Sequence, residues 1–282
     1  MKRVLVLFCI FLQAAAQNVI TLKSPIALDK LPSGDMFALT LEGQGQVYRL
    51  QEISNQISAP ISSFKLPTWQ APSDIVSAIV NGQQTILVAG RGLKGGFIAK
   101  FSDTGQLGST WRSPHALAGL DYDFNKNTIY VASSDTPEIY QTSVYGGEIK
   151  YCGAVVGARQ LGPVIFDSTR NQLLIGEVRN GELYSLNLTT HRSHLVTSQL
   201  GSPQALLLSS DNRTLFIADA LQRKIYRLDL SNANAVPAVF SADRVFQEPV
   251  GLARLSSGAI VVADDRANAL FVLSPQGKVV GK

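Results

Sequence analysis

The chain has 282 residues, of which 45% are hydrophobic and 16% are charged, with 25 lysines and arginines against 21 aspartates and glutamates. This length is ample for one large domain with its own core. The near balance of charge, without a lysine- or arginine-rich cluster, argues against a nucleic-acid partner.

The N-terminus has the three parts of a secretory signal peptide: the positive charges Lys2 and Arg3, an apolar run over residues 4–12, and small residues at 14–16. We therefore predict a signal peptide over residues 1–16 and a secreted or periplasmic protein. The alternative is a buried N-terminal strand. A membrane-spanning helix needs about 20 apolar residues. No run in the sequence approaches that length, so no transmembrane segment is predicted.

Cleavage after Ala16 would leave residues 17–282, with 23 basic against 21 acidic residues, because Lys2 and Arg3 are removed. It would also leave Cys152 as the single cysteine, so no internal disulfide could form and the core must hold the fold. We predict that Cys152 is a free, partly buried thiol on an outer strand of the third repeat.

A short apolar strand recurs six times along the chain and ends at positions 42 to 50 residues apart. The six copies are Met36–Thr40, Ile86–Gly90, Ile129–Ser133, Leu173–Glu177, Leu215–Asp219 and Ile260–Asp264. A repeat of this length made of strands is typical of a β-propeller blade.

Two further markers recur in the same register. An amphipathic strand follows each copy and carries an aromatic or aliphatic residue at one position, namely Tyr48, Ile98, Tyr140, Tyr184, Tyr226 and Phe271. An apolar residue three positions before a proline precedes most copies, and Trp69 and Trp111 are two of these residues. We expect both tryptophans to wedge between neighbouring blades.

The three markers predict an all-β fold, a six-bladed β-propeller of four-stranded antiparallel blades, in one domain over residues 17–282. The ring must close, because an open sheet edge invites aggregation. We expect the segment Asn18–Leu22 to pack beside the outer strand of the last blade, near Lys278–Val280.

The last unit resembles an NHL repeat, because Pro249, Gly251, Gly258, Asp264 and Asn268 match that pattern. The fifth unit is similar to both NHL-type and gluconolactonase-type (SMP-30/LRE-like) blades. The second resemblance implies a central divalent metal held by a Glu, an Asn and an Asp. Leu161 stands where the glutamate would, and the residues after the leading prolines are Ile26, Ser73, His115, Val164, Gln204 and Val250. None of these is a carboxylate, so neither a metal nor another cofactor is predicted.

Acidic residues end three of the repeated strands, at Glu177, Asp219 and Asp264. Propeller symmetry would bring them round one mouth of the ring, where they could bind a ligand. The favoured alternative is that each bonds the backbone amides of its own turn. Basic residues lie in the same turns, among them Arg91, Arg179 and Arg266, with His115 and Gln204 expected nearer the axis. These mixed charges suit a polar or anionic ligand or a protein partner, and they equally describe a solvated rim.

No nucleophile motif, phosphate loop or dinucleotide fingerprint accompanies these residues. We therefore predict an exported NHL-like propeller that acts as a ligand-binding, protein-binding or scaffold module, whose partner is an unknown protein or a small polar ligand. The rival hypothesis is a diverged gluconolactonase-like or sugar-acting hydrolase, in which His115 could serve as a base.

Overall fold

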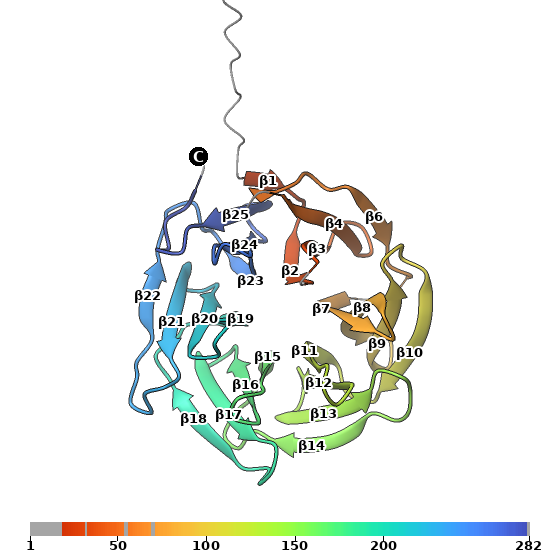
Figure 1. Ribbon diagram of the computed structural model, residues 1–282. Coiled ribbons are helices and arrows are strands. Elements are labelled where there is room, and N and C mark those ends of the chain that lie inside the picture. The colour runs from red at the N-terminus through yellow and green to blue at the C-terminus, as the bar shows by residue number, and fades with distance from the viewer. Residues whose placement is uncertain (1–18, 32, 54–55, 69–70, 281–282) are drawn as a thin grey trace, which may run out of the picture.

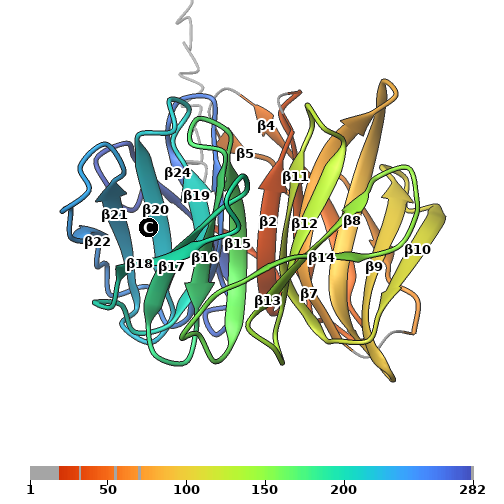
Figure 2. The same cartoon turned by 90° about the horizontal axis from the view of Figure 1, so that it is seen from below.

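Six antiparallel sheets stand around a central axis and form a six-bladed β-propeller (Figure 1). The computed structural model describes residues 19–31, 33–53, 56–68 and 71–280. Within these ranges every helix or strand position that is assigned belongs to a β-strand. The strands run between the two faces of the disc (Figure 2). The described residues contain no long apolar helix of the kind that spans a membrane. The predicted fold class is confirmed.

Each of the first three blades is built in chain order from the axis outward. Their strands are β2 (Pro25–Lys30), β3 (Asp35–Thr40), β4 (Gln46–Ile53), β5 (Gln56–Ile57) and β6 (Ser62–Lys65) in blade 1, β7 (Ala71–Val80), β8 (Gln83–Gly92), β9 (Gly95–Ser102) and β10 (Leu107–Ser113) in blade 2, and β11 (Leu117–Asp123), β12 (Thr128–Ser133), β13 (Glu138–Ser143) and β14 (Lys150–Ala154) in blade 3. In blade 1 the outer position is divided between β5 and β6, which pair with opposite ends of β4.

The last three blades follow the same order, except that the N-terminal strand completes the sixth. Their strands are β15 (Leu161–Asp167), β16 (Gln172–Glu177), β17 (Glu182–Asn187) and β18 (Ser193–Thr197) in blade 4, β19 (Pro203–Leu208), β20 (Thr214–Asp219), β21 (Lys224–Asp229) and β22 (Ala238–Ser241) in blade 5, and β23 (Pro249–Arg254), β24 (Ile260–Asp264), β25 (Ala269–Leu273) and β1 (Val19–Thr21) in blade 6.

The repeated strand that defines the sequence period is the second from the axis in every blade. It is covered by a strand on each side and by a neighbouring blade on each face, which explains why its central residues are apolar. In β24, all five residues are buried.

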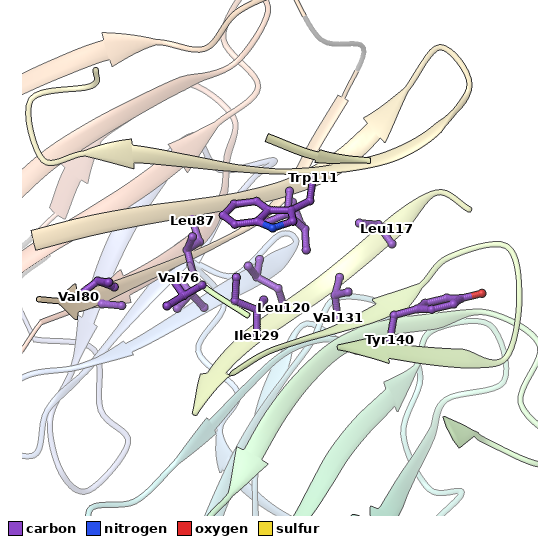
Figure 3. Packing of buried hydrophobic residues seen from close by; sticks show 13 residues of the cluster. Val76, Val80, Leu87, Trp111, Leu117, Leu120, Ile129, Val131 and Tyr140 are labelled. Atoms are coloured by element: carbon purple, nitrogen blue, oxygen red, sulfur yellow. The ribbon is translucent and has the colours of Figure 1, made fainter. Parts of the chain in front are cut away.

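The hydrophobic core consists of six clusters, and each cluster joins two consecutive blades. Between blades 2 and 3, the buried indole of Trp111 lies among Val76, Leu87, Leu120 and Ile129 (Figure 3). The predicted wedge is confirmed for this tryptophan, whereas Trp69 lies outside the described residues.

The third strands carry the predicted aromatic register in five blades. Tyr48, Tyr140, Tyr184, Tyr226 and Phe271 each pair with the third residue of the repeated strand before them.

The prediction was wrong for Ile98, which pairs with Ala89, so that Ala99 takes the register position opposite Val88. The pairing of β8 with β9 continues beyond Gly90 to Gly92 and Gly95, so Gly90 pairs with the residue seven positions later, whereas Glu177 pairs with the residue five positions later. This longer hairpin places Ala99, one residue after Ile98, at the register position.

Cys152 lies on β14, the outer strand of blade 3, as predicted, and it forms no disulfide. It is buried rather than partly buried, because it faces Val155, Tyr184 and Leu186 in the cluster between blades 3 and 4. Burial raises the pKa of the thiol to about 11, so it stays protonated and unreactive at neutral pH.

The ring is closed by β1, which pairs with β25 from Val19↔Phe271 to Thr21↔Ala269. The next segment also holds blade 6: Ser24 donates its amide to Asn268 at 2.9 Å and its hydroxyl to Asp265 at 2.5 Å. The predicted contact with the last blade is confirmed, and Val279 bridges Leu273 farther along the same edge of β25. Asn18 lies outside the described residues.

Deleting residues 18–22 should lower the free energy of unfolding by at least about 2 kcal/mol. The deletion exposes one edge of β25 and removes the buried side chain of Leu22, and loss of a buried leucine side chain alone costs about 2–5 kcal/mol. Urea denaturation of the deleted chain beside one that begins at residue 18 measures the difference. Equal midpoints would mean that the ring closes without this strand.

Candidate functional site

The three strand-ending acids are structural parts of the turns. Glu177, Asp219 and Asp264 are fully buried. Asp219 accepts hydrogen bonds from the amides of Gly201, Ser202 and Gln222 at 2.6, 3.0 and 2.9 Å. Each carboxylate therefore fastens the connector that leads into its blade to the turn after its own strand.

The same arrangement recurs at the other two acids. Glu177 accepts from the amides of Gln160 and Asn180. Asp264 accepts from the amides of residues 247, 248 and 267 at 2.8 to 2.9 Å. This is the backbone-bonding alternative that the sequence favoured.

A depression lies on this face of the disc, and we call it the arginine depression. It has a volume of about 380 Å³ and is formed by turns and connectors of blades 4, 5 and 6. Its lining residues are Val178, Arg179, Gly201, Ser202, Gln204, Ala220, Leu221, Arg223, Gln247, Glu248 and Arg266. The structure thus brings together three of the predicted site residues, Arg179, Gln204 and Arg266, and adds Arg223.

The arginines of the depression are exposed. Arg266 lies 3.2 Å from Glu248, in a pair whose arginine side chain is 66% exposed. Arg179 and Arg223 have no ion-pair partner within the ranges that the structure describes. The lining side chains comprise three arginines and one acid, Glu248, so the exposed charge is chiefly positive. The buried carboxylates of Asp219 and Asp264 lie behind it and bond the amides of four lining residues.

Two predicted site residues lie elsewhere. Arg91 is exposed on blade 2, where it pairs with Ala71. His115 was expected near the axis, and that expectation was wrong. In blade 3, Leu117 pairs with Ser133 as Pro72 pairs with Gly90 in blade 2, so Leu117 rather than Pro114 corresponds to the leading prolines.

His115 lies in the connector before that position and stacks on Tyr140, with ring centroids 5.8 Å apart. Its Nδ1 is 3.6 Å from Oδ1 of Asp135. Burial acts to raise the pKa of Asp135, but hydrogen bonds from Ser133 and Ala116 and the charge of His115 lower it. The pair is a partly exposed acid–base dyad on blade 3.

The axis holds a central cavity of about 200 Å³, lined by the inner strands of all six blades. Three aspartates of the lining, Asp29, Asp74 and Asp121, were missed in the sequence. Each lies beside apolar residues within an inner strand, in "ALDK", "SDIV" and "GLDY". An acid next to apolar residues in an inner strand is the signal that could have revealed them, because a buried carboxyl group must find a partner.

Each of these aspartates accepts a backbone hydrogen bond from the next blade. Asp29 accepts from the Ser77 amide at 2.5 Å, Asp74 from the Leu120 amide at 2.9 Å, and Asp121 from the Phe166 amide at 2.6 Å. We call these three residues the aspartate belt. The belt links blades 1 to 4, and the positions that correspond to Asp29 in blades 4 to 6 hold Ile165, Leu207 and Ala253.

Burial raises the pKa values of the belt. It raises the pKa of Asp74 and Asp121 to about 7 each, against the lowering effect of their backbone hydrogen bonds, and the charge of Asp29 raises both further. Burial likewise raises the pKa of Asp29, although the bonds from Ser77 oppose it. The carboxyl groups of Asp74 and Asp121 are therefore partly protonated near neutral pH.

The residues at the axis do not fit the divalent metal that the gluconolactonase resemblance implies. The cavity-lining residues that follow the register position of the leading prolines are Ile26, Ser73, Ala118, Gly162, Gln204 and Val250. None is a carboxylate, and the oxygens of the aspartate belt are bonded to backbone amides. The described part of the chain contains no group of three His, Cys, Asp or Glu residues arranged to hold a metal ion.

Comparison with known proteins supports the fold and adds a family. The model of the "SMP-30/Gluconolactonase/LRE-like region" matches residues 43–282. No curated protein matches the chain significantly in sequence.

Several solved structures are similar in fold. A chain of a nidogen/laminin complex superposes with a TM-score of 0.71 at 15% identity, over 86% of this chain and 90% of that one. Catalytically inactive virginiamycin B lyase from Staphylococcus aureus with quinupristin gives 0.66 at 13% identity, over 95% and 85%. A streptogramin B lyase gives 0.61 at 12%, over 89% and 93%. At these identities the likeness concerns the fold alone.

The free energy of unfolding should fall as the pH rises from about 5 to about 8. The pKa values of Asp74 and Asp121, about 7 in the folded state, lie above the value of about 3.9 for an unfolded aspartate. The folded state therefore binds more protons in this interval. One pKa unit corresponds to about 1.4 kcal/mol, so we expect a loss of at least that size in urea denaturation.

The double substitution Asp74→Asn and Asp121→Asn provides the control. Each amide keeps an acceptor oxygen for the neighbouring blade and cannot titrate, so the pH dependence should flatten. A parent whose stability is constant or rises over this interval, or a double variant with an undiminished slope, would contradict the assignment.

Removing divalent cations should leave stability unchanged. Because the axis lacks carboxylates at the ligand positions, EDTA should shift the melting temperature by no more than the measurement error. A loss of several degrees, restored by Ca²⁺, would show that the fold contains a metal site.

Proposed function

The chain belongs to the SMP-30/gluconolactonase/LRE-like family, and we propose that within it this protein is an exported binding module rather than a metal-dependent lactonase. The observation that supports this proposal is the contrast between two regions of the propeller. The axis has no carboxylate at the positions that follow the leading prolines, where the family resemblance implies metal ligands, whereas the turn face carries a depression lined by exposed polar side chains from three blades.

The arginine depression has the size of a small-molecule site, since such pockets measure about 300–1,000 Å³. Its walls are fixed by the buried acids: Asp219 and Asp264 hold the turns of blades 5 and 6, and Glu177 holds that of blade 4. Rigid turns that present exposed side chains favour recognition, because little conformational freedom is lost on binding.

Export is supported by the sequence of residues 1–16, which has the charged, apolar and small-residue parts of a signal peptide. Intact-mass measurement of the protein from its native host tests this proposal. A chain that begins at Gln17 would support it, and retention of Met1–Ala16 would count against it.

A panel of small probes tests the binding function. ¹⁵N-labelled protein is titrated with glucose, galacturonate, glutamine, citrate and inorganic phosphate, and amide shifts are recorded. At least one probe should cause shifts concentrated at residues 178–179, 201–202, 204, 220–223, 247–248 and 266. Shifts confined to other residues, or none at millimolar concentration, would contradict a site on this face.

The second candidate function is catalysis by the dyad of His115 and Asp135, whose atoms lie 3.6 Å apart. Similar propellers include a streptogramin B lyase. A histidine can act as a general base through its own imidazole nitrogen. Gluconolactone and quinupristin are the substrates to assay. Turnover that His115→Ala abolishes would favour an enzyme over the binding module.

A further inference from the structure

The arginine depression places exposed arginines close to buried acids. Arg179 and Arg266 each follow, by two residues, the acid that ends the repeated strand, Glu177 and Asp264. In sequence each arginine lies near an acid of opposite charge. In the structure the carboxylates are fully buried and bonded to amides, while the arginine side chains are exposed on the face above.

The buried acids are therefore not partners of these arginines. Glu177 and Asp264 accept their hydrogen bonds from residues 160, 180, 247, 248 and 267, all through backbone amides. Each carboxylate bonds the amides of its turn and makes no ion pair with the arginine two residues on. The guanidinium groups of Arg179 and Arg266 therefore remain at the surface, where another acceptor can reach them.

The one acid in the lining is a weak competitor. Glu248 lies 3.2 Å from Nε of Arg266, but the pair is solvent-exposed, with 66% and 36% of the two side chains accessible. Exposed ion pairs of this kind contribute little. An incoming anion can replace Glu248 at Arg266 while it also meets Arg179 and Arg223, which have no ion-pair partner in the described ranges.

The chemistry of the donors indicates the acceptor. Guanidinium groups present planar forks that match carboxylate and phosphate oxygens, and such bidentate bonds are among the strongest hydrogen bonds in proteins. Gln204, at the inner margin of the depression, adds a neutral amide that can bind a hydroxyl or carbonyl group. Arginines from three successive blades favour more than one acidic group.

We infer that the arginine depression binds a small molecule with at least two acidic groups, carboxylate or phosphate, held by Arg179, Arg223 and Arg266. The inference rests on the proposed binding function and narrows its ligand class. It excludes neutral sugars as the principal ligand.

Calorimetric titration of the full chain with citrate, inorganic phosphate and glucose tests the inference. Citrate or phosphate should bind and glucose should not, and the affinity should fall at least tenfold between low salt and about 0.5 M NaCl, because salt screens exposed charges. The citrate and phosphate arms distinguish the two acid types. Binding of glucose at the depression with neither anion binding would overturn the charge assignment and leave the binding function intact.

Two double substitutions of equal charge change provide the decisive comparison. Arg179→Glu with Arg266→Glu should weaken anion binding at least tenfold. Lys150→Glu with Arg227→Glu, exposed positions on β14 and β21, should leave it within about twofold. Equal losses in both variants would mean that net charge, and not this site, attracts the anion.

A charge-neutral block separates failure of the inference from failure of the proposed function. Gln204→Trp places a bulky group in the depression and should reduce binding of any ligand there. If this variant loses binding while Arg179→Glu with Arg266→Glu keeps it, the site is real and the arginines do not select the ligand. If no probe is affected by either variant, the depression is not a binding site at all. The melting temperatures of all variants, which should stay close to that of the parent, show that each is folded.

Discussion

Face-to-face packing between consecutive blades is the interaction on which the rest of the structure depends. All six hydrophobic clusters join two blades, and the last, between blades 6 and 1, includes Leu22 from the N-terminal segment. A single blade would expose two apolar faces, so none is stable without neighbours. The requirement for a closed ring explains why β1 leaves the first blade and completes the sixth, and why the connectors are fastened so firmly to the turns.

The acidic residues divide into two structural classes, and this division separates the two regions where a function could reside. Glu177, Asp219 and Asp264 fasten turns within a blade, whereas Asp29, Asp74 and Asp121 connect one blade to the next across the central cavity. Both classes spend their oxygens on backbone amides. Arginine side chains from blades 4, 5 and 6 remain exposed in the depression on the turn face, and for this reason the proposed binding site is placed there and not at the axis.

The period of the repeat made the number of blades and the closing contact predictable, because each blade needs the same buried second strand. Register within a blade was less predictable where connector lengths differ. Ile98 and His115 were misplaced because the turn of blade 2 is paired to its tip and because Leu117, rather than Pro114, begins blade 3. The aspartate belt was not foreseen, since the partner of each aspartate lies on the next blade and only the folded structure shows it.

The pairing of Val19 with Phe271 joins residues about 250 positions apart, and this has a consequence for biosynthesis. Strand β1 is made before every other strand that the structure describes, yet its partner β25 is made last, so the ring can be completed only after the rest of blade 6 has been synthesised. Loop closure over such a separation is slow. Until it occurs, β25 presents a free edge that can pair with another chain. The yield of folded protein should therefore fall at high expression, when unfinished chains meet one another before β1 has covered the edge of β25.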